Sequence, residues 1–193
     1  SINIPQAQVE LNGVLKSSDA HRVICDYQGN WWWTTPEVHL ETLVDAVSWL
    51  PSELETLKKD ISVLSPKGTL SHPVAWLNSE GEFRLEAQVE GLSADPWEGA
   101  PGATNIHGKL VLEQDRGFIN IEAGSTALSF PEVFQRPQHF DRVSGRVDWW
   151  YDENVVRAYS DGLKLDSPSI DARVGFAFEL EMPADEARLG VDV

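Results

Sequence analysis

A run of strict two-residue alternation near the C-terminal end constrains the fold of this chain most strongly. Successive side chains of a β-strand point to opposite faces, so such a run predicts a strand with one apolar and one largely polar face. Its apolar positions are Ile170, Ala172, Val174, Phe176, Phe178, Leu180 and Met182. Further strands are expected at 1–15, 22–27, 82–92, 106–113, 117–123, 125–130, 142–151, 154–160 and 163–166, with a last one from about 187.

The rhythm of turns between these segments is typical of an antiparallel all-β protein. Residues 65–68, 93–105 and 131–139 read as turns or connectors. Parallel strands would need helical crossovers, and only residues 36–60 have Leu and Val at helical spacing, after a possible capping box formed by Thr34 and Glu37. We therefore expect a mainly β fold: an antiparallel, strongly twisted sheet folded into a trough or open sandwich, with one helical insertion at about 36–60. That insertion is expected to pack on the core rather than to cover a groove.

Length and charge limit the partners of the chain. Its 193 residues predict a single β-rich domain, with N-terminal strands and the helical segment in 1–64 and a β-meander in 65–193. The strand-like pattern at both ends suggests a fragment of a longer protein. The 31 acidic and 15 basic side chains give a formal net charge of −16. This charge repels phosphate backbones, so no nucleic-acid partner is expected, and no apolar stretch is long enough to span a membrane.

Residues that could perform catalysis form no pattern in the sequence. The five histidines are scattered, without the spacing of a metal site, and no nucleotide-binding or nucleophile motif is present. Cys25 stands on the apolar side of an expected strand and is better interpreted as a small buried hydrophobe than as a nucleophile. We therefore expect no enzyme activity, no cofactor and no metal.

The chain is rich in tryptophan, with eight residues, five of which stand in the blocks 31–33 and 149–150. Neighbouring rings in a strand must point to opposite faces, so at least one ring in each block is expected to be exposed or only partly covered. Exposed indoles suit either a carbohydrate-binding surface or the rim of a groove for acyl chains. Packing at a sheet edge or under a helix is the third possibility, and the sequence leaves all three open.

From about Leu64 onward the sequence resembles a known family. The similarity is carried by "LSPKGTLSH", by "GEFRLEAQVEGLSADPWEGAPGATNIHGKLVLEQDRGFINIEA", by "LSFPEVFQRPQHFDRVSGRVDWW" and by "LKLDSPSIDARVGFAFELEMP". Its most specific points are Pro66 to Gly68, the loop at 100–102, the turn at 130–134 and the "WLP" at 49–51. These segments resemble the AsmA-like YhdP proteins of Gram-negative bacteria, over at least residues 40–183.

The resemblance implies an elongated β-sheet curled into a trough whose apolar interior holds lipid acyl chains. It also implies a role in moving phospholipid between the inner and outer membranes, and a chain that is a periplasmic segment of an inner-membrane-anchored protein. The implied partners are phospholipid or fatty acyl chains and neighbouring β segments of the full-length protein. Membrane contact would occur only through parts absent from this chain. The family offers no catalytic residues to carry over.

Pattern alone selects the residues expected to line such a groove, and for each of them a place in an ordinary core is the alternative. They are Phe83, Leu85, Val89, Leu110, Leu112, Ile119, Ile121, Leu128, Phe130, Val147, Trp149, Phe176, Phe178 and Leu180. Two other functions stay open beside the lipid groove. One is a Trp-rich β-sandwich that binds carbohydrate or serves adhesion, in which case Trp32 and Trp150 should carry glycan binding. The other is a structural spacer that pairs its edge strands with neighbouring segments.

Overall fold

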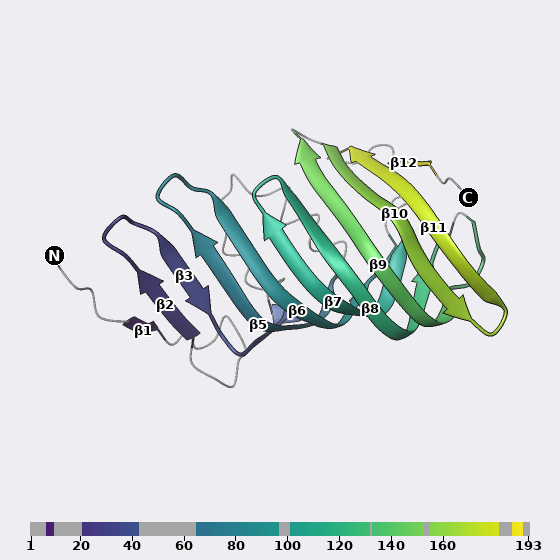
Figure 1. The fold of residues 1–193 in the computed structure, drawn as a ribbon, viewed down its shortest axis with the longest axis horizontal. Helices are drawn as coiled ribbons and strands as arrows, with labels where there is room; N and C mark the ends of the chain where they lie inside the picture. The colour runs from purple at the N-terminus through teal and green to yellow at the C-terminus, as the bar shows by residue number, and fades with distance from the viewer. Residues whose placement is uncertain are drawn as a thin grey trace.

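The fold of the chain, given by a computed structural model, is one open antiparallel β-sheet (Figure 1). The structure describes residues 7–9, 21–42, 65–96, 101–131, 133–152, 155–181 and 187–190. Within these ranges the sheet has twelve strands. They are β1 (Ala7–Val9), β2 (His21–Cys25), β3 (Trp31–Thr34), β4 (Glu37–His39), β5 (Lys67–Leu77), β6 (Phe83–Ala94), β7 (Gly102–Glu113), β8 (Arg116–Ser129), β9 (Gln138–Asp152), β10 (Val155–Ser167), β11 (Ile170–Glu181) and β12 (Ala187–Gly190).

The order of the strands in the sheet follows their order in the chain. Each strand pairs antiparallel with the next, except that β3 and β4 lie end to end along β5. Figure 1 shows this succession from β1 near the N-terminus to β12, with a strong twist across the sheet. The expected fold class, a mainly antiparallel and strongly twisted open sheet, is confirmed.

The strands differ from the expected ones where a turn signal lies inside a strand. Residues 67–77 form β5, although the Pro-Gly signals at 65–68 suggested only a turn. The two strands expected at 117–123 and 125–130 are one strand, β8, because Ser125 adopts a left-handed backbone (φ 51°) without ending the pairing with β9. The strands expected at 154–160 and 163–166 are likewise one strand, β10, which continues through a register shift between Ser160 and Leu163. Bulges of this kind bend a strand without ending it.

The helical insertion expected from about residue 36 begins later than the sequence indicated. Residues 37–39 form strand β4, and helix appears only at 40–42. The capping-box interpretation is wrong, because Thr34 pairs with Val74 in the sheet and Glu37 pairs with Ser71. The rest of the insertion, from residue 43 to 60, lies outside the described residues, as does most of the strand expected at 1–15.

A line of left-handed residues crosses four neighbouring strands, β5 to β8, and lies toward one end of β6, β7 and β8. His72 in β5, Gly91 in β6, Asn105 in β7 and Ser125 in β8 all have positive φ, between 51° and 64°. Register shifts accompany the first three. Bulges increase local twist and curvature, so these four residues, here called the bend line, curve successive strands at neighbouring places.

Polar groups cross-link the bend line. The amide Nδ2 of Asn105 donates to the carbonyl oxygen of Ser125 at 3.3 Å, and the backbone N–H of Asn105 donates to Ser93 Oγ at 3.2 Å. Ser93 Oγ in turn donates to the Gly91 carbonyl at 3.3 Å. Thr126, which is fully buried, points its hydroxyl at the Asn105 carbonyl, 3.5 Å away. Bulges leave backbone groups without ladder partners, and these side chains take up part of that deficit.

One cluster of buried apolar side chains forms the core, and it includes Phe140 and Val143 of β9. These two residues are three positions apart, so the alternation of buried side chains shifts between them, next to Ser125 on the neighbouring strand. The cluster comprises Val38, Leu70, Ala87, Val89, Ile106, Ile119, Ile121, Ala123, Phe140, Val143 and Leu163.

Candidate functional site

The strand register places an uninterrupted apolar row on one face of the sheet. From β3 to β11, each residue of this row is the direct cross-strand partner of the next, and every one of them is Trp, Phe, Leu, Ala or Gly. We call these residues the inner row and their side of the sheet the inner face. The inner row consists of Trp33, Ala75, Leu85, Leu112, Gly117, Trp149, Ala158 and Phe178.

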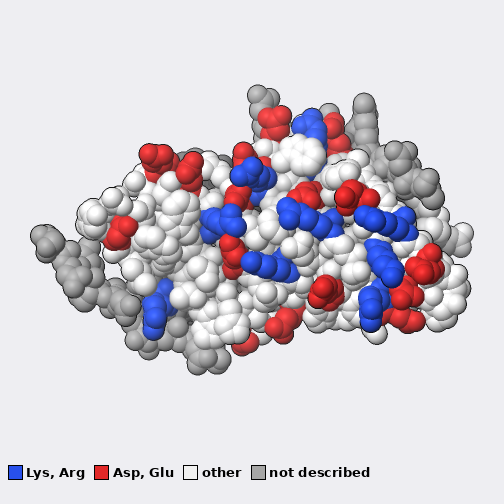
Figure 2. All heavy atoms as spheres, viewed as in Figure 1, with Lys and Arg blue, Asp and Glu red and all other residues white. Residues whose placement is uncertain are grey.

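The immediate sequence neighbours of these residues form a second row on the opposite, outer face. This outer row consists of Trp32, Trp76, Arg84, Glu113, Arg116, Trp150, Arg157 and Glu179. Figure 2 shows positive and negative side chains interleaved across the face of the sheet turned to the viewer. Because adjacent residues of a strand point to opposite sides, a difference of one position in sequence separates an apolar from a charged surface.

Burial on the inner face falls along the strands, away from the bend line. Near it, Val89 and Ile121 are buried and Val143 is completely so. In the inner row Leu85 and Leu112 are only half-buried. At the hairpin that joins β5 to β6, Leu77 and Phe83 are 43% and 39% exposed. The inner face is therefore packed at one end and accessible at the other.

Trp149 rests on a glycine of the neighbouring strand. Gly117 is its direct cross-strand partner, and a Cβ at Gly117 would lie 2.7 Å from two carbons of the Trp149 indole. Real Cβ atoms do not approach other atoms so closely, so only glycine leaves room for the ring. The indole thereby covers the middle of the inner row and joins the packing around the core.

Ion pairs connect the outer sides of β6, β7 and β8. Arg84 pairs with Glu113 and with Glu86 (2.8 Å), and Lys109 Nζ lies 3.0 Å from Glu86. Arg116 Nε donates to Glu113 at 2.6 Å. The hydrogen bond from Lys109, and then that from Arg84, lowers the pKa of Glu86, while the hydrogen bond from Arg116 contributes most to the lowered pKa of Glu113. Both carboxylates stay charged at neutral pH.

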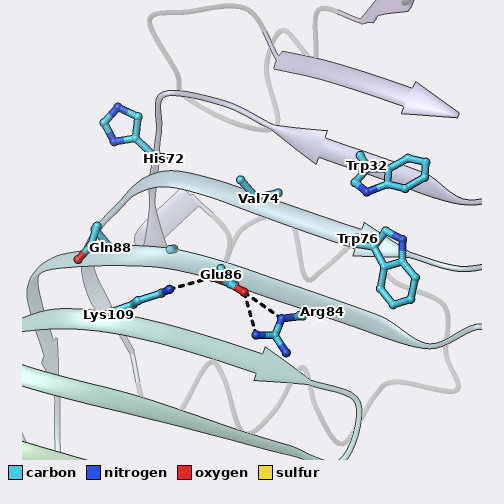
Figure 3. Close-up of a pocket in the computed structure, with 9 residues that line it drawn as sticks. Trp32, His72, Val74, Trp76, Arg84, Glu86, Gln88 and Lys109 are labelled. Carbon is cyan, nitrogen blue, oxygen red and sulfur yellow. Dashed lines mark hydrogen bonds and ion pairs between the residues drawn. The ribbon is translucent and has the colours of Figure 1, made fainter.

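A shallow hollow of about 440 Å³ lies on the outer face beside this network. Figure 3 shows Trp32 and Trp76, from β3 and β5, near one end of it, with Arg84, Glu86 and Lys109 joined by ion pairs alongside. Val74, which is 47% exposed, also lines the hollow, on the same strand as Trp76. The hollow thus combines indole rings with fixed hydrogen-bonding groups.

Most of the residues predicted to line a groove lie on the inner face, though their burial differs. Val89, Ile119, Ile121 and Phe178 are buried. Those that are half-buried are Leu85, Leu110, Leu112, Leu128, Phe130, Val147, Trp149 and Phe176. Phe83 is exposed, and Leu180 pairs through its backbone with Val156, while its side chain lies outside the description.

Phe130 stands apart from the others, because it follows the end of β8 and packs edge-on against Phe134 with ring centroids 6.4 Å apart. The prediction also missed inner-face residues. Leu70 and Ala75 belong to the unforeseen β5, where the alternation of Leu70 with polar neighbours was the available signal. Trp33 belongs to one of the tryptophan blocks noted in the sequence, but only the strand register shows on which face of the sheet its ring lies.

Within the described ranges, no three His, Cys, Asp or Glu side chains come together as metal ligands would. The described part of the chain also contains no helix that is both long enough and apolar enough to cross a membrane.

The described residues thus form an open antiparallel β-sheet with an apolar row on one face and a row of charged and tryptophan side chains on the other, and comparison with protein families identifies the family. The family model described as YhdP protein matches residues 3–192. The chain therefore belongs to the YhdP family, which is related in general to lipid transport, and the resemblance noted in the sequence is confirmed. No curated protein and no solved structure matches the chain.

Proposed function

We propose that this chain is a non-catalytic segment of a periplasmic lipid-transport protein anchored in the inner membrane. Its inner face would hold phospholipid acyl chains on their way between the inner and outer membranes. The observation that carries the proposal is the inner row, a succession of apolar cross-strand partners from Trp33 to Phe178.

The energetics of transfer explain why such a row is needed. Removing hydrocarbon from water yields about 0.8 kcal/mol per methylene, so an acyl chain of about 16 carbons needs on the order of 10 kcal/mol of apolar contact outside a bilayer. One pocket residue cannot supply that, but a sheet face can. Seven strand spacings of about 4.8 Å make the inner row about 34 Å long. One leaflet of hydrocarbon is about 15 Å thick, so the row exceeds the length of a single acyl chain.

The burial gradient supports entry from one side. The buried residues near the bend line would form the floor, and the half-buried Leu85, Leu112 and Trp149 would contact the lipid. Neighbouring β segments of the full-length protein would continue the row, since β1 and β12 each pair with only one strand of the described sheet. An unpaired edge is a template for another strand.

Photo-crosslinking at paired positions tests the proposal. Benzoylphenylalanine would replace either Leu112 or Glu113, and either Trp149 or Trp150, in the chain incubated with phosphatidylethanolamine vesicles. Lipid adducts, detected by mass spectrometry, should form at Leu112 and Trp149, and should be at least tenfold rarer at the two outer positions. Equal labelling of both faces, or delipidated protein that takes up no fluorescent phospholipid, would overturn the proposal.

A further inference from the structure

The outer face carries exposed indoles that the lipid proposal does not use. Trp32 and Trp76 are direct cross-strand partners and are only half-buried. Trp150 lies in the same outer row and is 41% exposed. Four strand spacings separate Trp76 on β5 from Trp150 on β9, a distance of about 19 Å. The main cluster of buried side chains packs with the residues of the inner face, so packing against that cluster does not account for these rings.

Charged groups fill the interval between the indoles, and each takes part in at least one ion pair. The guanidinium of Arg84 is fixed by Glu86 and Glu113, Lys109 is held by Glu86, and Arg116 is held by Glu113. Three cations and two anions leave little net local charge. Because ion pairs already orient these donors and acceptors in part, a ligand that needs both would lose less free energy in ordering them than it would with unpaired side chains.

We propose that the outer row is a binding site for an uncharged glycan chain, with Trp32 and Trp76 at one end and Trp150 at the other. A pyranose ring offers a face of C–H groups, which suits the electron-rich face of an indole. Its edge carries hydroxyls that both donate and accept hydrogen bonds. Beside the tryptophan pair, Arg84 supplies donors, Glu86 supplies acceptors and Gln88 supplies both.

Two other ligand classes fit the same surface less well. A phosphate group seeks unpaired cations, but Arg84, Lys109 and Arg116 already share carboxylates, and the net charge of −16 opposes any polyanion. An acyl chain needs continuous apolar contact, whereas the outer row changes from indole to charge at Arg84. The site therefore complements a ligand that is both amphipathic and neutral.

Isothermal titration calorimetry with chitohexaose and cellohexaose tests the proposal, since both probes are uncharged β-linked chains. We expect saturable binding to at least one of them, weakened tenfold or more in Trp76→Ala and in Trp150→Ala. Tyr151→Ala is the matched control, because Tyr151 is an aromatic residue of similar exposure that directly follows Trp150 in β9 and therefore points to the opposite face of the sheet. It should bind as the unchanged protein does. Circular dichroism and thermal unfolding would establish that the variants fold.

Three outcomes would overturn the proposal: no binding of either probe at millimolar concentration, equal weakening by Tyr151→Ala, or salt-sensitive binding of an acidic glycan in preference to both probes. Phospholipid uptake by Trp76→Ala separates this proposal from the lipid function. It should be unchanged, because Trp76 lies on the outer face. Loss of lipid uptake with glycan binding intact would instead contradict the assignment of the two faces.

Discussion

Asn105 and Ser125, on adjacent strands, both have left-handed backbones (φ 60° and 51°), and the side-chain amide of Asn105 donates to the Ser125 carbonyl at 3.3 Å. The bend of β7 is thereby tied to the bend of β8. Curvature in this sheet thus depends on a shared contact between strands as well as on the bulge within each one.

Replacing Asn105 by alanine should therefore destabilise the fold. The variant loses the hydrogen bonds of the amide and places a less tolerant residue in a left-handed conformation, so we expect a loss of about 1–3 kcal/mol in the free energy of unfolding. Urea unfolding would measure it. Asn120→Ala is the control, since Asn120 is exposed on β8 and makes no side-chain hydrogen bond within the described residues; a loss as large there would contradict the role given to Asn105.

The seat of Trp149 on Gly117 gives a second expectation. In Gly117→Ala the new methyl group must displace the indole, so we expect a loss of about 1–3 kcal/mol, as for overpacked cores. Thermal unfolding and near-ultraviolet circular dichroism would report it. Gly124→Ala on the same strand has its nearest neighbour, the Asp141 carbonyl oxygen, at 3.6 Å and should change stability by less than about 0.5 kcal/mol. Similar losses in the two variants would show that the indole does not matter.

Phe140 tests whether the buried cluster holds the bent part of the sheet together. Truncation to alanine removes a ring that is 6% exposed, and we expect a loss of about 3–5 kcal/mol in chemical denaturation. Phe134→Ala removes the same group from a side chain that is 45% exposed and should have a much smaller effect. Equal effects would mean that Phe140 does not belong to the stabilising core.

Acid should weaken the outer ion-pair network. The folded state lowers the pKa of Glu86 and Glu113 below the ordinary 4.5, chiefly through the hydrogen bonds from Lys109 and Arg116 respectively. A lowered pKa means that their stabilisation is present above about pH 4.5 and is lost as pH falls through the lower folded values. The melting temperature should therefore drop between pH 5 and pH 3.

Variants test whether protonation of Glu86 and Glu113 causes this fall in melting temperature. It should be smaller in the double variant Glu86→Gln, Glu113→Gln, whereas Glu122→Gln should leave it unchanged, because Glu122 has no ion pair within the described residues. The difference will be modest, since exposed pairs contribute little. An unchanged drop in the double variant would assign the acid sensitivity to other carboxylates.

Alternation predicted the strands well wherever it ran without interruption. The segment expected at 82–92 is β6 (Phe83–Ala94), and the one expected at 170–182 is β11 (Ile170–Glu181). It failed where glycine and proline stand inside a strand, as Gly68 and Pro73 do in β5, because local turn preferences do not reveal that a neighbouring strand absorbs the bulge. The same limit hid the bend line, whose left-handed positions include His72 and Ser125 rather than glycine alone.

The candidate site was predictable as a set of residues but not as two surfaces. Alternation indicated that Leu85, Leu112 and Ile119 each face the apolar side of a strand. It could not indicate that the apolar residues of successive strands all lie on the same face of the sheet, because this depends on the strand register, which hairpin geometry and bulges set. The division of the tryptophan blocks, with Trp32 and Trp150 outward and Trp33 and Trp149 inward, likewise required the register.

Because strand order repeats chain order, each hairpin is bonded only to the hairpins on either side of it. A pulling force applied at the two termini would then separate the strands one after another from the edges of the sheet, instead of unfolding the molecule in one step. A layout of this kind lets length vary by whole hairpins while the hydrogen-bonding pattern of the remainder stays intact.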